Sequence, residues 1–244
     1  MCGRYSITTA PEALRRLFAF EERPNLAPRA NVAPTQGVPA VRRDEEGQRH
    51  LALLRWGLLP PWAKDLSIGA KMINARAETV AEKPAFRQAF AKRRCLLPAD
   101  GFYEWKADAT KGKSKAPKQP HRIQFEGRPP FAFAGLWERW GRDENRIESV
   151  TIITCPANEG LTWLHHRMPV ILSPDGFEAW LNPDQDLEAL QSLLQPYDDA
   201  AGAYGPIQTY PVSTALNKAT NEDVALLEPL ALEGAAKEEQ PRLL

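Results

Sequence analysis

The sequence predicts an α+β fold, a single domain with a mostly antiparallel, barrel-like β core and short peripheral helices. Its 244 residues suit one large domain. Its 22 prolines favour loops and short strands over long helices. Short apolar runs alternate with short helical patterns, without an internal repeat or a clear linker. We expect the domain to span residues 2–230, and residues 231–244 have the composition of a frayed tail.

The first predicted helix begins near the N-terminus. Thr9 offers a capping hydroxyl and Pro11 falls early in the first turn, where proline is tolerated. Leu14, Leu17 and Phe18 follow at helical spacing and form one apolar face. Further short helices are expected at residues 84–90, from 173 to about 181, and at 187–194.

The remaining apolar runs indicate strands. Residues 95–98 and 102–105 flank Ala99-Asp100-Gly101, a pattern typical of a strand, a tight turn and a second strand. Other strands or extended segments are expected at residues 31–34, 51–54, 123–125, 131–137 and 150–154. The polar, lysine-rich stretch 107–120 indicates a loop.

The composition favours a cytoplasmic, soluble protein. The chain is 43% hydrophobic and 25% charged, and its longest apolar runs, such as 131–137, fall far short of the ~18 residues that span a bilayer. The N-terminus lacks the pattern of a signal peptide. Three cysteines without CxxC spacing indicate a reducing compartment and neither a disulfide framework nor a zinc site. We therefore expect no membrane association, no metal and no cofactor.

Charge is unevenly distributed along the chain, although the net charge is zero. Residues 55–128 hold 16 Lys and Arg against 7 Asp and Glu, whereas residues 172–240 hold 13 acidic residues and two lysines. A surface that faces phosphates produces such polarity. An unevenly charged, solvated surface produces it equally well, so motifs must decide between them.

Cys2 follows the initiator methionine and precedes Gly3. Methionine is readily removed before small residues, so the mature chain is expected to begin with cysteine, which carries an amine and a thiol on adjacent carbons. The amine can condense with an aldehyde to an imine, and the thiol can then close a thiazolidine ring. An α-amine with a pKa of about 7.8 is roughly a third free base near pH 7.5, whereas a lysine at about 10.4 is only about a thousandth free. A thiolate is the stronger nucleophile and can be activated by its surroundings.

Four segments in order carry a family resemblance. They are MCGRY at 1–5, MINARAET at 72–79, DGFYEW at 100–105 and LHHRMP at 164–169. The chain resembles the SRAP family, the SOS-response-associated peptidase or abasic-site-processing proteins. NVAPT at 31–35, RWGLLPPW at 55–62 and PVS at 211–213 also match, so the resemblance runs from Cys2 to about Pro229.

The resemblance implies a protein that crosslinks covalently to abasic sites in single-stranded DNA and shields the lesion. Asn74 matches the asparagine that positions the cysteine, and Glu104 matches an active-site glutamate that moves protons. Glu104 is expected to be partly buried in a strand, with a raised pKa. His165 matches the family's histidine by register. His166 is the alternative, and in an extended segment it would point to the opposite face from His165.

DNA contacts are also implied. Arg4 and Arg76 match positions that hold phosphates near the lesion. Trp62 and Trp105 offer faces for flanking bases, although burial in a core is the ordinary fate of tryptophan. The other cysteines, Cys95 and Cys155, are expected to be buried, and His50 and His121 to lie on the surface.

Two other functions compete with the crosslinking reading. Glutamine amidotransferases of the N-terminal-nucleophile type also begin Met-Cys-Gly, but they leave the three later motifs unexplained. A non-catalytic reader of single-stranded DNA would need only the basic side and the aromatic residues. The resemblance leaves open whether Met1 is removed by the protein itself, as a peptidase, or by a cellular aminopeptidase. It also implies association with the nucleoid when damaged DNA is bound, and a lyase-type side reaction through the imine.

Overall fold

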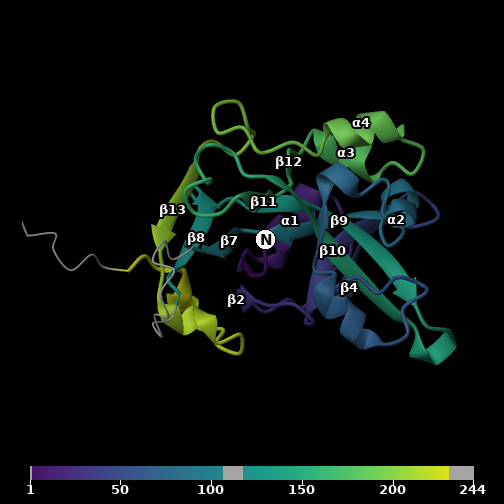
Figure 1. Ribbon diagram of the computed structural model, residues 1–244, viewed down its shortest axis with the longest axis horizontal. Helices are drawn as coiled ribbons and strands as arrows, with labels where there is room; N and C mark the ends of the chain where they lie inside the picture. Colours follow the sequence, from purple (N-terminus) through teal and green to yellow (C-terminus); the bar gives the residue numbers. More distant parts are fainter. Residues whose placement is uncertain (1, 107–117, 231–244) are drawn as a thin grey trace, which may run out of the picture.

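The structure, a computed structural model, describes residues 2–106 and 118–230. Its centre is a closed barrel of five strands in the ring order β10-β4-β3-β6-β9 (Figure 1). The barrel strands are β3 (Gly37–Arg43), β4 (Arg49–Trp56), β6 (Arg94–Ala99), β9 (Phe131–Trp140) and β10 (Ile147–Pro156). Neighbours in the ring are antiparallel except β4 and β10, which are parallel. The predicted barrel-like, mostly antiparallel core is confirmed.

Three short strands extend the barrel sheet. β5 (Asn74–Arg76) runs parallel to β10, and β11 (Arg167–Pro169) runs antiparallel to it. β12 (Ile171–Leu172) pairs with β9. The segments that carry Asn74 and the histidine motif are therefore both attached to β10.

A second sheet of five strands lies beside the barrel, at the left in Figure 1. Its strands, all antiparallel, follow the order β13 (Ile207–Pro211), β8 (Pro120–Phe125), β7 (Gly101–Trp105), β1 (Tyr5–Ile7) and β2 (Arg29–Val32). Tyr5 and Phe102 on one face belong to the main core. Tyr103 on the other face belongs to a smaller cluster with residues of η4 (Thr214–Asn217) and η5 (Val224–Leu227).

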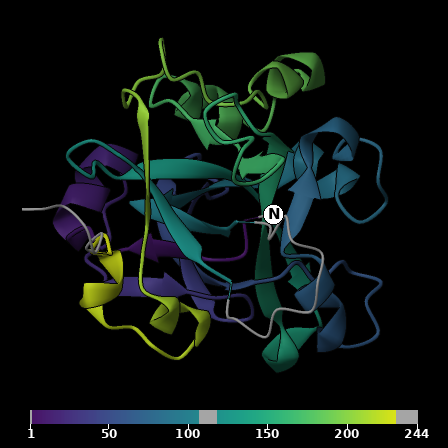
Figure 2. The ribbon, with the colours of Figure 1, turned by 60° about the vertical axis from the view of Figure 1, so that its left-hand side comes forward.

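The predicted strand–turn–strand at residues 95–105 is present as β6 and β7, but it is not a hairpin. β6 belongs to the barrel and β7 to the second sheet, so the chain crosses between sheets at Asp100. Figure 2 shows the two sheets from another side, with the purple strand β1 near the start of the chain as part of the second sheet. Asp100 is thus a junction residue rather than a turn residue.

The first helix, α1 (Pro11–Phe18), has the predicted proline in its first turn and buries Leu14 and Phe18. Thr9 does not cap it, because the N-cap is Ala10, which has no side chain to accept a bond. The Thr9 amide and hydroxyl instead donate to Asp100 Oδ2, at 2.9 and 3.2 Å. The capping hydroxyl was therefore misassigned, since a buried carboxylate competes for it.

The other helices are short and peripheral. They are α2 (Arg87–Lys92), α3 (Gly176–Leu181) and α4 (Leu187–Ser192), with the 3₁₀ turns η1 (Leu66–Lys71), η2 (Ala77–Thr79) and η3 (Asp143–Asn145). α2 begins later than predicted because residues 83–86 form turns that precede it. Within the described ranges, no helix combines the length and apolarity that crossing a membrane requires. Most of the predicted loop 107–120 and the predicted tail 231–244 lie outside the described residues.

Candidate active site

Cys2 lies immediately before β1 and is completely buried in the main core. Its Sγ is 3.9 Å from the carbonyl oxygen of Arg4. Burial raises the pKa of the thiol strongly, and the negative charge of Glu104 raises it further. The thiol is therefore protonated at rest, and a base must take its proton before sulfur can attack.

Glu104 lies on β7, directly beside the start of the chain. Tyr5 pairs with Phe102, and the Tyr103 amide donates to the Arg4 carbonyl at 3.0 Å. Continuing this antiparallel ladder brings Glu104 level with Gly3, next to Cys2. The Glu104 residue is 5% exposed. Burial raises its pKa to about 7, and the positive charge of the amino terminus acts in the opposite direction. Near neutral pH this carboxyl can therefore both give and take a proton.

Asn74 is the first residue of β5, level with Ile152 of β10. Its Nδ2 donates to the Ile152 carbonyl oxygen over 3.5 Å. Its Oδ1 is buried and accepts no hydrogen bond from the described residues. A buried amide oxygen in this state is ready to accept from a donor that enters the site.

His165 lies in the turn-rich segment between β10 and β11. Its Nδ1 lies 2.9 Å from the amide nitrogen of Arg167 and 3.0 Å from the carbonyl oxygen of the same residue. The amide donates to Nδ1 in the tautomer that carries its proton on Nε2, and Nδ1 donates to the carbonyl in the other tautomer. Burial lowers the pKa of the imidazole, and the positive charge of the amino terminus lowers it further. The imidazole of His165 is therefore mostly neutral at pH 7.

The two adjacent histidines do not point to opposite faces, as an extended segment would require. Their rings are stacked, with centroids 4.4 Å apart and planes 26° apart. The reason is that the segment turns, because the amides of Leu164 and His165 both donate to the Leu161 carbonyl. The expectation of opposite faces was wrong.

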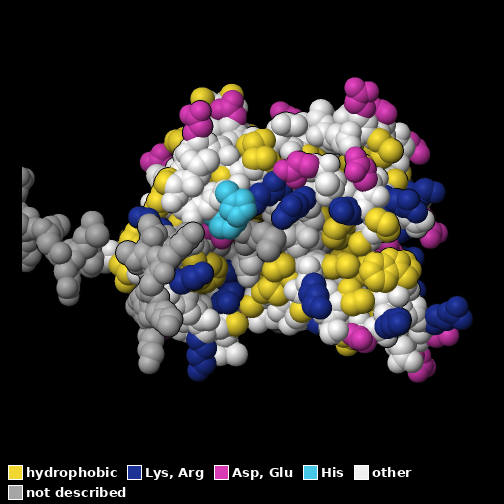
Figure 3. Space-filling model, in the orientation of Figure 1, with side chains coloured by type: hydrophobic (Ala, Val, Ile, Leu, Met, Phe, Trp, Pro, Cys, Tyr) yellow, Lys and Arg dark blue, Asp and Glu magenta, His cyan; other side chains and the backbone are white. Residues whose placement is uncertain are grey.

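Three of the four predicted catalytic residues, Cys2, Glu104 and His165, are linked electrostatically. Glu104 acts electrostatically on Cys2, and the charge of the amino terminus acts on Cys2, Glu104 and His165. Asn74 lies on β5, the strand that pairs with β10. Figure 3 shows histidine side chains (cyan) next to Lys and Arg side chains (dark blue) near the middle of this face, with acidic side chains mostly toward its rim.

The four residues predicted to contact DNA divide into two pairs. Arg4 Nη1 donates to Asn31 Oδ1 at 2.7 Å and to the Leu216 carbonyl at 2.9 Å, and the guanidinium lies 5.8 Å from the centre of the Trp105 ring. The Trp105 Nε1 donates to Asn217 Oδ1 at 2.6 Å. By contrast, Arg76 and Trp62 are exposed, Trp62 with 56% of its surface. The first pair is built into the protein, and the second faces solvent.

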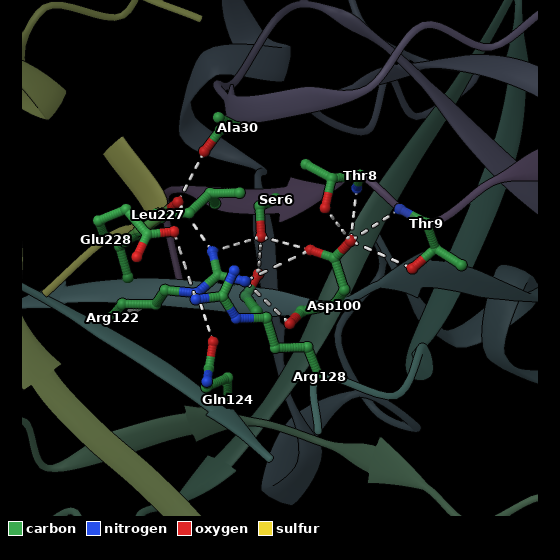
Figure 4. Close-up of polar contacts among 12 residues, drawn as sticks. Ser6, Thr8, Thr9, Ala30, Asp100, Arg122, Gln124, Arg128, Leu227 and Glu228 are labelled. Carbon is green, nitrogen blue, oxygen red and sulfur yellow. Dashed lines mark hydrogen bonds and ion pairs between the residues drawn. The ribbon is translucent and has the colours of Figure 1, made fainter. Parts of the chain in front are cut away.

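A buried polar network, missed by the sequence reasoning, supports the strands of the site (Figure 4). The Asp100 carboxylate accepts from the Ser6 and Thr8 hydroxyls at 2.6 and 2.8 Å, and Arg122 donates to Ser6 Oγ at 2.8 Å and to the Tyr103 hydroxyl at 3.0 Å. A Cβ on Gly101 would meet the Arg122 guanidinium at 2.6 Å, which explains the glycine. In the sequence, the aspartate and glycine of the DGFYEW motif were the residues that could have indicated this network.

A second connection joins two of the motifs. Arg167 of LHHRMP forms a two-pronged ion pair with Glu78 of MINARAET, and its Nη2 also donates to the Thr154 carbonyl at 2.5 Å. The ion pair fixes the histidine segment against η2. Glu78 is acidic and Arg167 is basic, and they lie in two different motifs. Their opposite charges were visible in the sequence, but the motifs alone did not predict the pair.

Other predictions are settled by burial. Cys95 and Cys155 are buried, as predicted. His121 is not a surface residue: it is 9% exposed, because it faces inward across from Glu104 in the β7–β8 pair. His50 is half-buried, with its Nε2 accepting from Arg42 at 2.9 Å.

Among the described residues, no group of three or more His, Cys, Asp and Glu side chains is arranged to hold a metal ion.

Known proteins are similar to this chain in sequence and in fold. The sequence profile of the family "SOS response associated peptidase (SRAP)" matches residues 1–219. "Abasic site processing protein YoqW" of Bacillus subtilis is 43% identical over 233 residues, covering 93% of this chain and 99% of that protein. "Abasic site processing protein HMCES" of Xenopus tropicalis is 29% identical over 266 residues, covering 91% of this chain and 76% of that protein.

The fold has a solved counterpart. A crystal structure of a protein from Bacteroides thetaiotaomicron aligns with a TM-score of 0.81 at 25% identity, covering 94% of this chain and all of the other. The matched residues include all four motifs and both sheets of the structure. The chain therefore belongs to the SRAP family.

Proposed function

We propose that the protein processes abasic sites in single-stranded DNA by bonding covalently to them through Cys2. The observation that carries the proposal is the pairing of a buried Cys2 with a buried Glu104 whose pKa is about 7. An amine and a thiol that react with an aldehyde need a nearby group that exchanges protons near neutral pH. The names of the relatives, abasic site processing proteins, support the same lesion as substrate.

The reaction begins when Met1 has been removed and the Cys2 amine is free. The abasic sugar exists mainly as a closed hemiacetal, and His165 in its protonated form can give a proton to the ring oxygen as the ring opens, which returns the imidazole to its neutral form. Glu104 takes the proton from the C1′ hydroxyl, which leaves an aldehyde. Because the pKa of Glu104 is about 7 and that of His165 is lowered, near neutral pH Glu104 is partly ionised and only a fraction of His165 is protonated.

The amine then adds to the aldehyde carbon, and the resulting carbinolamine loses water to give an imine. Glu104 in its acid form donates the proton that leaves with this water. The Cys2 thiol adds across the C=N bond: sulfur bonds to C1′, the nitrogen gains a proton, and a thiazolidine closes. The balance is one aldehyde and one aminothiol converted to one ring and one water.

The neutral state of the thiol supports this order of events. Because burial holds the thiol protonated, the amine attacks first and sulfur follows as its proton passes to a nearby base. Asn74 Oδ1, an acceptor without a donor among the described residues, can hold the N–H of the amine during attack. We assign Asn74 this orienting role.

The proposal extends to three further points. The protein acts in the cytoplasm and joins the nucleoid through damaged DNA. Arg76 and Trp62, which face solvent, contact the strand. The Met1 peptide bond is cut either by the chain itself or by an aminopeptidase, and both routes give the same amine. Mass measurement of protein made by cell-free translation without aminopeptidase separates the two routes.

A denaturing gel of protein mixed with abasic single-stranded DNA tests the function against its competitors. We expect a band that survives heat and detergent with the parent protein and is lost in Cys2→Ala. Release of ammonia from glutamine would instead favour an amidotransferase. Binding that high salt fully reverses, with no surviving band, would favour a non-catalytic reader of single strands.

A further inference from the structure

Trp163 is an exposed tryptophan beside the candidate active site. It shows 50% of its surface to solvent, whereas Trp56 and Trp180 are fully buried. Its ring meets the His121 ring edge-on, with centroids 5.3 Å apart and planes at 86°. The Lys106 ammonium lies 5.3 Å from the centre of the same ring. The side chain is thus fixed by two neighbours while half of it remains accessible.

The position of Trp163 follows from the β7–β8 register. Glu104 pairs with His121, so the two side chains share one face of the sheet. Lys106 is two residues beyond Glu104, and its amide continues the ladder to the Gln119 carbonyl at 3.4 Å. Its side chain therefore returns to the face of Glu104. Trp163 contacts both neighbours of Glu104 on this face and precedes His165 by two residues.

The chemistry of this group matches a nucleotide. A solvent-exposed indole that its neighbours already hold in place loses little conformational freedom when it binds a ligand. It can stack on any nucleobase, since every base has an aromatic face. An ammonium beside it complements a phosphate, and the pair offers both contacts that a single strand presents in each repeat. The edge-on contact with the His121 ring fixes the orientation of the indole, so less conformational entropy is lost when a base stacks on it.

We propose that Trp163 and Lys106 form a stacking platform for the nucleotide that adjoins the abasic position. Trp163 stacks on its base and Lys106 meets its phosphate. The inference rests on the proposed function, because it takes single-stranded DNA as the ligand. It adds a base contact that the four motifs do not contain.

The probe is a single strand with a tetrahydrofuran abasic analogue, which has no aldehyde and cannot crosslink. The fluorescent base 2-aminopurine is placed at the first or second position on either side of the analogue, and affinity is followed by anisotropy. Trp163→Ala is expected to weaken binding about 5- to 150-fold, the range for one stacked base. Trp163→Phe keeps a ring and is expected to recover most of the affinity. Lys106→Ala is expected to reduce the salt slope by about 0.7.

Quenching of 2-aminopurine at one position, present in the parent and lost in Trp163→Ala, is the expected signature of the stack. The matched control is Leu187→Ala at the start of α4, a hydrophobic side chain of similar exposure, 47%, on a different element. Equal affinity and equal quenching in the parent and in Trp163→Ala would overturn the platform. Failure of the parent to crosslink a true abasic strand would overturn the proposed function alone, because the analogue measures binding without chemistry.

Discussion

Arg122 and Asp100 form an ion pair that is almost completely excluded from water, with Nη2 3.5 Å from Oδ1. Arg122 comes from β8, and Asp100 stands at the crossing from the barrel to β7. The pair lies under the strands that bring Glu104 beside the start of the chain. Its hydrogen bonds to Ser6 of β1 and to Tyr103 of β7 join those two strands.

Breaking this pair is expected to destabilise the fold. Arg122→Met removes the partner of a buried carboxylate, and loss of one member of such a pair costs about 3–5 kcal/mol. Urea unfolding measures the change in the free energy of unfolding. The comparison is Arg15→Met, which removes an exposed i,i+3 partner of Glu12 and is expected to change stability by less than about 0.5 kcal/mol. Equal effects of the two substitutions would contradict the role of the buried network.

Glu104→Gln is expected to change how stability depends on pH. The folded-state pKa of Glu104 is raised to about 7 from an ordinary value of 4.5, so between these values the folded protein holds a proton that the unfolded chain has lost. Stability therefore falls as pH rises through this window, by up to roughly 3 kcal/mol, and the loss is absent in Glu104→Gln. Parallel stability–pH curves for the two proteins would refute the raised pKa.

The same variant is informative in kinetics. Glutamine keeps the shape and hydrogen-bonding size of glutamate without a titrating proton. Single-turnover crosslinking by Glu104→Gln is expected to be slower by about 10²–10⁴-fold and to lose the step near pH 7 that Glu104 gives the parent. A full crosslinking rate in Glu104→Gln would remove this carboxyl from proton transfer.

The histidines are separated by their hydrogen bonds. His165→Ala is expected to slow adduct formation by about 10²-fold or more, because it removes the imidazole that moves protons at the ring oxygen. His166→Ala is expected to stay within a few-fold of the parent, since it removes only a stacking neighbour of His165. Transfer of a pre-formed adduct to competitor DNA is measured alongside. A defect confined to His166→Ala would reverse the assignment.

The two arginines predicted to hold phosphates should now differ. Arg76→Ala is expected to lower the salt slope of single-strand binding by about 0.7 while leaving the unfolding free energy unchanged, because Arg76 is exposed. Arg4→Ala is expected to cost about 1–3 kcal/mol of stability as well, because Arg4 supports Asn31 and Leu216. If the two variants changed the salt slope and the free energy of unfolding by the same amounts, the distinction between a structural Arg4 and an exposed Arg76 would be wrong.

Local pattern was enough to predict many elements and the class of fold. Apolar runs marked β8, β9 and β10, and Pro11 marked the start of α1, since these signals depend on nearby residues. The pairing of β6 and β7 with different sheets was out of reach, because it is decided by the distant strands β3, β9 and β1. Thr9 was misread for the same reason: its competitor, Asp100, lies 91 residues away.

The site was predictable where a motif named the residue and unpredictable where packing decides its state. Cys2, Asn74, Glu104 and His165 came from the motifs, but the neutral thiol of Cys2 and the stacked rings of His165 and His166 depend on burial and on a turn. His121 appeared to be an ordinary surface histidine, because nothing in its neighbours indicates that it faces Glu104 across the β7–β8 pair. Trp163 gave no signal, because exposure is a property of the folded chain.

Intact mass spectrometry of the adduct with an abasic single strand tests the central claim most directly. The account predicts one species with the mass of the protein lacking Met1 plus the DNA minus one water, formed without a reductant. Cys2→Ser is expected to give that species only after borohydride treatment, with two added hydrogens, and to cleave part of the DNA by β-elimination. An adduct of unchanged yield in Cys2→Ala, or one that retains Met1, would contradict the account.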